Sequence, residues 1–228
     1  MASSYLRLPI QESIGFYQAS IGKKMVMAVT GCILVLFVIG HLLGNLQVYL
    51  GPDKLNSYAR FLRSTGSLLW IVRAVLFVSA VLHVVTGILL WLENQRARPI
   101  GYRRRQWVEA TLASRTMIVT GLAMAAFVVY HLLHLTFGTV HPSFNHELDV
   151  YSNVVKGFQQ APAAVAYIGF MIFLGFHLSH GIWSMFQSVG WNHPRYMPYI
   201  QRAAVVLAVL IVAGNIAIPL SILVGIVR

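Results

Sequence analysis

Five apolar runs, each long enough to cross a lipid bilayer, constrain this chain more than any other feature of its sequence. A membrane-spanning helix needs about 20 mainly apolar residues. The runs cover about 25–50, 68–92, 117–139, 163–189 and 203–227. Helices and closed barrels are the only structures that satisfy every backbone polar group in lipid. The sequence therefore predicts an all-α integral membrane bundle of five transmembrane helices, forming one domain over residues 1–228.

The few charged residues lie mostly in the segments that join these runs. Basic residues concentrate in the N-terminal segment and in the second and fourth connections. By the positive-inside rule this predicts a cytoplasmic N-terminus and an external C-terminus. We therefore assign the net charge of +11 to loops that face an anionic leaflet, with no nucleic-acid partner. The GYRRRQW stretch at 101–107 is interpreted as a topology signal or a docking rim.

Two short surface segments are expected outside the spans. Residues 3–20 mix polar and apolar types and are typical of an amphipathic lead-in on the membrane surface. The long third connection, about 140–162, is expected to form a short helix on the outer face. No internal repeat is expected, so one membrane domain accounts for the chain.

Six of the nine histidines lie inside the predicted spans. They are His41 on the first span, His83 on the second, His131 and His134 on the third, and His177 and His180 on the fourth. Ionisable residues inside a membrane are costly and usually face the bundle interior or a functional site. One buried imidazole most often bonds a neighbouring helix. Four helices that each supply one favour a shared role instead.

The depths of four of these histidines match in pairs. At about 1.5 Å per residue, His41 and His131 lie roughly 21 to 24 Å from the cytoplasmic ends of their helices. His83 and His177 lie roughly 21 to 23 Å from the outer ends of helices that run the other way. This predicts an outer pair, His41 and His131, and an inner pair, His83 and His177. The two levels would be roughly 10 to 15 Å apart.

Two imidazoles on opposite helices at one depth are the axial ligands that a six-coordinate haem needs. The single cysteine, Cys32, excludes an iron–sulfur cluster or a cysteine zinc site within the chain. Bundle interiors commonly hold such cofactors. Bis-histidine ligation favours electron transfer over oxygen chemistry. Nearby glycines would leave room for the macrocycle or allow close helix packing: Gly40, Gly44, Gly87, Gly175 and Gly181.

Three further polar residues accompany these pairs. His134 and His180 each follow a predicted ligand by three residues, so each lies on nearly the same helix face. We interpret them as partners of a haem propionate or a quinone carbonyl, with bonds between helices as the alternative. A metal site in which two histidines three residues apart chelate one ion is less favoured, because no carboxylate accompanies either His-x-x-His pair. Arg73 is a candidate partner for propionates of the outer haem, or a residue that snorkels to the interface.

Four strings on successive spans carry a family resemblance: GHLLGN, VLHVVTG, VVYHLLH and FHLSHGIWS. In this order they resemble the five-helix, di-haem cytochrome b subunit that anchors succinate dehydrogenase and fumarate reductase, and the last string is the most specific. The resemblance runs from about residue 20 to the end of the fifth span. It implies two haem b groups, one on His41 and His131 and one on His83 and His177. It also implies a quinone, with menaquinone favoured over ubiquinone.

The resemblance further implies the setting of the chain. It would be a multi-pass subunit of a prokaryotic inner (cytoplasmic) membrane, with a flavoprotein and an iron–sulfur subunit docked on its N-terminal side. The dicarboxylate chemistry would belong to the partner subunit, and this chain would pass electrons between the iron–sulfur subunit and membrane quinone. Such complexes often form higher oligomers. Membrane lipid is the remaining partner.

Some positions qualify the resemblance. Ser20 and Lys24 are similar to a polar pair at the cytoplasmic end of the first helix in related anchors, and are candidate quinone contacts; a surface cap and a topology lysine explain them equally well. Gly175 stands where some fumarate reductases carry a glutamate linked to proton movement. His180 stands where some relatives carry asparagine.

Three alternative functions remain at the level of sequence. The chain could be the cytochrome b anchor of another respiratory dehydrogenase, such as a hydrogenase or a formate dehydrogenase. It could be a transporter or channel that uses histidines for protons or metal ions, although this gives no reason for the paired depths. It could also be a structural anchor without haem.

Overall fold

The computed structural model describes residue 15 and residues 17–97, 110–147 and 149–228. Within these residues every regular element is a helix. Five helices are long and apolar enough to cross a membrane, so the prediction of an all-α, five-span protein is confirmed. They are α2 (Ser20–Asn45, continued by the 3₁₀ helix η1, Leu46–Leu50), α4 (Ser67–Arg96), α6 (Met117–Leu135), α8 (Ala161–Ser188) and α9 (Met197–Leu223). The GYRRRQW stretch and most of the expected lead-in lie outside the described residues.

Two spans end or begin away from their expected limits. The third helix ends at Leu135 instead of Thr139, because the chain turns at Gly138 with a φ of 75° that glycine tolerates and other residues rarely adopt. The fifth helix begins at Met197, well before Ala203. Pro198 lies in its first turn, where the missing amide proton has no helical partner to lose.

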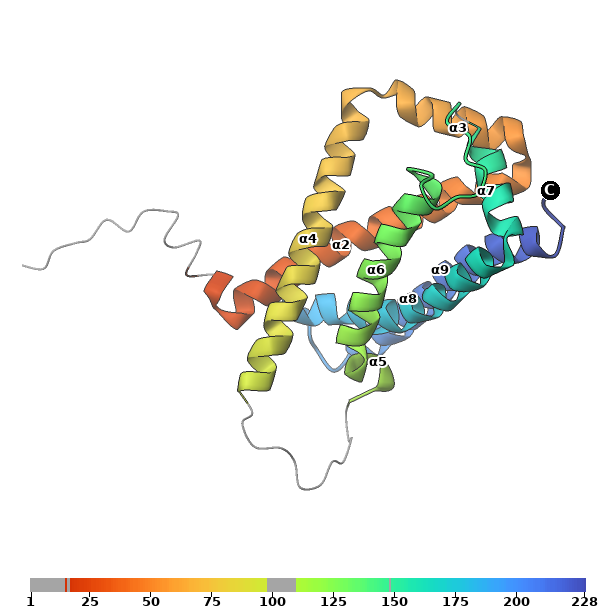
Figure 1. Ribbon diagram of the computed structural model, residues 1–228. Helices are drawn as coiled ribbons and strands as arrows, with labels where there is room; N and C mark the ends of the chain where they lie inside the picture. The colour runs from red at the N-terminus through yellow and green to blue at the C-terminus, as the bar shows by residue number, and fades with distance from the viewer. Residues whose placement is uncertain (1–14, 16, 98–109, 148) are drawn as a thin grey trace, which may run out of the picture.

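Three shorter helices connect the spans. The short helix expected in the third connection is present as α7 (Val150–Gln159), whereas α3 (Pro52–Ser64) and α5 (Leu112–Arg115) were not expected. The start signal of α3 is clear in retrospect: Pro52 opens it and Asp53 lies in its first turn. Figure 1 shows α3 and α7 together with the C-terminus at one end of the bundle and α5 at the other. We call these the α7 end and the α5 end.

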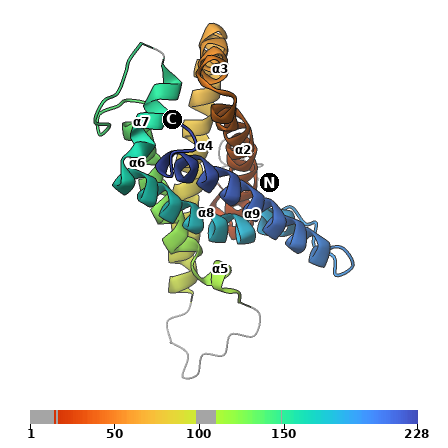
Figure 2. The same cartoon turned by 90° about the vertical axis from the view of Figure 1, so that its right-hand side faces the viewer.

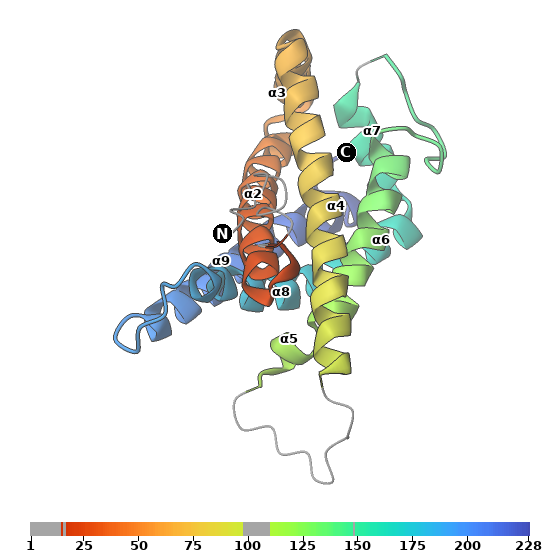
Figure 3. The same ribbon diagram turned by 90° about the vertical axis from the view of Figure 1, so that its left-hand side faces the viewer.

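Four of the long helices form a ring. Close packing joins α2 to α4, α4 to α6, α6 to α8 and α8 to α2. Figure 3 shows α4 in front, with α2 on one side of it and α6 on the other. The helix α9 lies outside the ring along α8, as Figure 2 shows. The diagonal partners, α2 with α6 and α4 with α8, therefore face each other across the middle of the ring.

The apolar core is divided between two places. The larger cluster lies toward the α7 end and includes Phe127, Phe158 and Tyr167. The smaller one lies between α8 and α9, where Ala204 and Ala208 allow close approach of the helices. Many large apolar side chains on the outer faces of the helices remain exposed. Such a surface suits contact with lipid chains.

Candidate functional site

The histidines meet in pairs across the diagonals of the ring. The ring centres of His41 on α2 and His131 on α6 are 5.7 Å apart, with an angle of 87° between the ring planes. The ring centres of His83 on α4 and His177 on α8 are 6.3 Å apart, with an angle of 64°. The structure thus brings together the same outer and inner pairs that the depth argument predicts.

These separations fit one metal ion between each pair. A metal–imidazole bond is about 2 Å long and the bonded nitrogen lies about 1 Å from its ring centre, so two rings sharing a metal have centres about 6 Å apart. In the described part of the chain, no group of three or more His, Cys, Asp or Glu side chains could hold a metal ion by itself. A pair of imidazoles at this separation therefore suits a metal whose other ligands come from a bound macrocycle, as in bis-histidine haem.

A threonine on α2 orients the first inner histidine. The Nδ1 atom of His83 lies 3.1 Å from the Oγ1 atom of Thr30. That hydroxyl donates its proton to the carbonyl oxygen of Val26 at 2.6 Å, so its oxygen is left to accept from Nδ1–H of the histidine. The remaining nitrogen, Nε2, then keeps its lone pair. This is the tautomer that a metal ligand requires.

A threonine on α6 does the same for the second inner histidine. The Nδ1 atom of His177 lies 3.3 Å from Oγ1 of Thr120, and this hydroxyl donates to the carbonyl oxygen of Thr116 at 3.0 Å. Both inner histidines are thus held by the same device from a neighbouring helix. Sequence reasoning did not single out either threonine.

The glycines that adjoin the inner histidines are also different from those expected. A Cβ atom on Gly31 would lie 3.2 Å from Cε1 of His83, and one on Gly121 would lie 3.3 Å from Cε1 of His177. By contrast, a Cβ atom on Gly40 would meet nothing within 4 Å, and one on Gly44 would collide with the ring of Tyr58. Gly44 therefore serves helix packing, and the close approach at the inner pair depends on Gly31 and Gly121.

An internal repeat would have revealed these four residues. Residues 29–43 and 119–133 share the pattern VTG-x5-FV-x2-HLL, and the helices that follow share H-x3-GI from His83 and from His177. The expectation of no internal repeat is therefore wrong. The units α2–α4 and α6–α8 each supply one threonine, one outer histidine and one inner histidine.

The outer histidines have unlike surroundings. The Nδ1 atom of His131 lies 3.2 Å from the hydroxyl oxygen of Tyr167 on α8, and Nδ1 of His134 lies 3.1 Å from the same oxygen. The ring of His41 stacks on Phe37 at 5.3 Å, and among the described residues it has no hydrogen-bond partner. Tyr167 is a site residue that hydropathy alone could not distinguish from the apolar residues around it.

The other predicted site residues lie in different environments. The Nδ1 atom of His180 is buried without a hydrogen-bond partner, and its ring meets Trp183 at 4.7 Å. Arg73 is exposed and lies 4.9 Å over the ring of Trp70 on the same helix, as expected of an interfacial arginine. Ser20 and Lys24 are exposed at the start of α2.

The buried cation at the α5 end is Lys23, one residue before the expected Lys24. Its ammonium forms an ion pair with Glu93 of α4 at 2.8 Å and donates to the carbonyl oxygen of Gln18 at 2.7 Å. Beside it, the Tyr17 hydroxyl lies 3.0 Å from Oγ1 of the fully buried Thr86. Lys23 lies seven residues before Thr30 and therefore on the same face of α2. This spacing is the sequence signal that could have predicted that Lys23 is buried.

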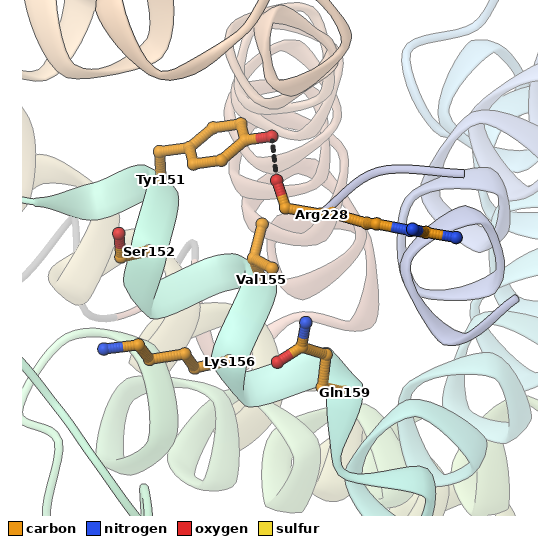
Figure 4. A pocket seen from close by; sticks show the side chains of 6 residues that line it. All are labelled: Tyr151, Ser152, Val155, Lys156, Gln159 and Arg228. Atoms are coloured by element: carbon orange, nitrogen blue, oxygen red, sulfur yellow. Dashed lines mark hydrogen bonds between the residues drawn. The ribbon is translucent and has the colours of Figure 1, made fainter. Parts of the chain in front are cut away.

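A separate hollow of about 250 Å³ lies at the α7 end, as Figure 4 shows. It is lined by Tyr151, Ser152, Val155, Lys156, Gln159 and Arg228. The hydroxyl of Tyr151 donates to the carbonyl oxygen of Arg228 at 2.9 Å. None of the predicted site residues lines this hollow.

Comparison with known protein families identifies a match. The family model described as succinate dehydrogenase/fumarate reductase transmembrane subunit matches residues 93–216, slightly more than half of the chain. Comparison with curated proteins and with solved structures finds no match. The matched range contains His131 and His177, whereas His41 and His83 lie before it. The internal repeat relates those two earlier histidines to the matched half.

Proposed function

The chain belongs to the family of succinate dehydrogenase/fumarate reductase transmembrane subunits, and from this premise we propose a di-haem electron-transfer role. Membership implies association with the catalytic subunits of the complex. In our proposal this chain holds two haem b groups and passes electrons between an iron–sulfur subunit and membrane quinone. Oxidation of succinate or reduction of fumarate would take place in the flavoprotein subunit.

The observation that carries the proposal is the pairing of four imidazoles across the diagonals of one helix ring. His41 and His131 would hold the outer haem, and His83 and His177 the inner haem. Haem, when bound, supplies reversible one-electron chemistry. The chain itself would supply two histidine ligands to each haem, a ligand set that favours electron transfer over oxygen chemistry. Thr30 and Thr120 hold the inner ligands in the binding tautomer.

Polar residues around the two histidine pairs would form hydrogen bonds to haem propionates or to the quinone. The buried, unpartnered Nδ1 atom of His180 supports a hydrogen bond to a propionate or a quinone carbonyl. His134 already bonds Tyr167 through Nδ1, so in this proposal only its Nε2 atom would face such a group. Ser20 and Lys24 are exposed where a quinone dissolved in lipid could reach them. Arg73 would have to move away from the ring of Trp70 in order to bind the propionates of the outer haem.

The proposed setting is a prokaryotic inner membrane with the N-terminus in the cytoplasm. The excess of basic residues in alternate loops supports this orientation. The flavoprotein and iron–sulfur subunits would then dock at the α5 end, which is also the end nearer the inner pair. Menaquinone is the quinone that we propose.

The test is the haem content of the purified complex with each proposed ligand changed to alanine, measured as the pyridine haemochrome. We expect two haems per chain in the parent complex and loss of the inner haem in His83→Ala and His177→Ala. His41→Ala and His131→Ala should lose the outer haem, and a redox titration of the visible spectrum should identify which haem remains. The exposed His146 gives the matched control, and His146→Ala should retain both. Equal haem content in all four variants would contradict the proposal.

A further inference from the structure

One phenol oxygen joins the outer pair to a buried histidine that is not one of the proposed ligands. The hydroxyl of Tyr167 lies 3.2 Å from Nδ1 of His131 and 3.1 Å from Nδ1 of His134. Tyr167 is 6% exposed and His134 is 1% exposed, so water does not compete at this point. Because a phenol has one proton, it can donate to only one of these nitrogens and must accept from the other.

Ligation decides the direction of both hydrogen bonds. If His131 binds iron through Nε2, its proton is on Nδ1 and is donated to the oxygen of Tyr167. The phenol proton is then donated to Nδ1 of His134, which places the proton of that ring on Nε2. This arrangement gives a partner to Nδ1 of both histidines and to the phenol. Tyr167 thus accepts a hydrogen bond from His131, as Thr30 accepts one from His83 and Thr120 accepts one from His177.

The third connection and α7 hold His134 in place. Its ring stacks on Tyr130 at 5.5 Å and on His141 at 5.1 Å. A Cβ atom on Gly157 of α7 would lie 3.1 Å from Cε1 of His134 and 3.0 Å from Nε2 of His141. The backbone of α7 therefore packs directly against both rings.

His141 is in turn fixed to the backbone of this segment. Its Nε2–H donates to the carbonyl oxygen of Asn153 at 2.9 Å, and Nδ1 accepts from the amide of Ser143 at 3.1 Å. The side chain of Asn153 bonds both the amide and the carbonyl of Asn145, at 2.7 and 2.8 Å. A continuous set of contacts therefore leads from His131 through Tyr167, His134 and His141 to the start of α7.

We infer that Tyr167 is a positioning residue that sets the electron donation of His131 to the outer haem, and that the packing of α7 acts on that haem through it. The inference rests on the proposed function. A ligand histidine that donates Nδ1–H to a good acceptor is a more basic ligand. It stabilises the ferric state and lowers the reduction potential.

The experiment is Tyr167→Phe in the intact complex, with Tyr130→Phe as the matched control. Tyr130 also packs on His134, but in the described part of the chain its hydroxyl makes no hydrogen bond. We expect Tyr167→Phe to keep two haems and to shift the outer haem's ferric–ferrous equilibrium about tenfold toward ferrous, which is about 59 mV for one electron. The electron paramagnetic resonance signal of the outer haem should move as well. The inner haem, and both haems of Tyr130→Phe, should be unchanged.

Unchanged outer-haem properties in Tyr167→Phe, or an equal change in Tyr130→Phe, would overturn the inference. A second variant, Gly157→Ala, places a methyl group against the rings of His134 and His141 and leaves Tyr167 unchanged. It tests the inference if Tyr167→Phe fails to hold the outer haem. A shifted outer potential with an unchanged inner potential in Gly157→Ala supports the inference, and an unshifted outer potential overturns it. Retention of both haems in His131→Ala would instead refute the proposed function.

Discussion

The inner and outer histidine pairs are alike in composition but are supported in different ways. Each inner histidine bonds a threonine of the preceding membrane-spanning helix, and the threonine hydroxyl donates its own proton to a backbone carbonyl of that helix. At the outer pair, only His131 has a hydrogen-bond partner among the described residues, and that partner is shared with His134. The inner pair therefore depends on contacts within the helix ring alone. The outer pair depends on the connection and on α7 as well.

This contrast predicts that changes in the ring act on the inner haem and that changes at the α7 end act on the outer haem. Two substitutions in the ring test this division, and a change of pH at the α7 end tests the contact between α3 and α7.

The largest effect is expected from Gly121→Leu. A Cβ atom alone would lie 3.3 Å from Cε1 of His177, so a leucine side chain must displace the imidazole from its partner. We expect loss of the inner haem with the outer haem retained, measured by haem content and redox titration. Gly169→Leu on α8 is the matched control, because a Cβ atom there would meet nothing within 4 Å. Retention of both haems in Gly121→Leu would show that the close approach is not required.

A smaller effect is expected from Thr30→Val. The change keeps the shape of the side chain but leaves Nδ1–H of His83 without its acceptor, which costs about 1 to 3 kcal/mol for a buried donor. We expect affinity for the inner haem to fall about 10- to 100-fold and its reduction potential to rise, as measured by haem retention during dilution and by redox titration.

Two companion variants isolate the hydrogen bond of Thr30. Thr30→Ser retains the hydroxyl and should restore both properties. Thr86→Val removes a buried hydroxyl that bonds Tyr17 and no histidine, so it should leave the inner haem unchanged. An effect on the outer haem in Thr30→Val would contradict the separation of the two pairs.

The smallest effect is expected from lowering the pH at the α7 end. Hydrogen bonds from Ser152 and Asn56 hold the pKa of Asp149 below its ordinary value. A lowered pKa in the folded state means that this carboxylate stabilises the contact between α3 and α7 above the pKa of the unfolded chain, about 4. This stabilisation is lost as the pH falls through the folded pKa. We expect the hydrogen-exchange protection factors of residues 150–159 to decline over that range.

The variant Asp149→Asn should remove this pH dependence while it retains a side-chain oxygen for the cap of α7. Asp53→Asn, in the first turn of α3, is the control and should behave as the parent does. A decline of equal size in Asp149→Asn would assign the effect to another group.

The five spans followed from hydropathy, because a membrane requires long apolar helices. The pairing of four histidines followed from their positions along those helices. The apolar runs predicted the five spans, and the turn at Gly138 and the proline at 198 account for the two limits that differed. The helix α3 was missed although Pro52 and Asp53 mark its start. Thr30 and Gly31 were missed because their signal is a repeat across residues 29–43 and 119–133, which becomes visible only when distant spans are compared.

Sequence alone was enough for the number of spans and for the pairs in which four of the histidines meet, since both follow from the rise of a helix and the thickness of a bilayer. It could not specify which polar atoms meet the imidazoles. Lys23 and Lys24 are neighbours in the chain, yet only Lys23 is buried, and Tyr167 differs from its apolar neighbours by one hydroxyl. Such contacts depend on the rotation of each helix about its axis and on the packing of α7 against the ring, which arise only when all the helices pack together.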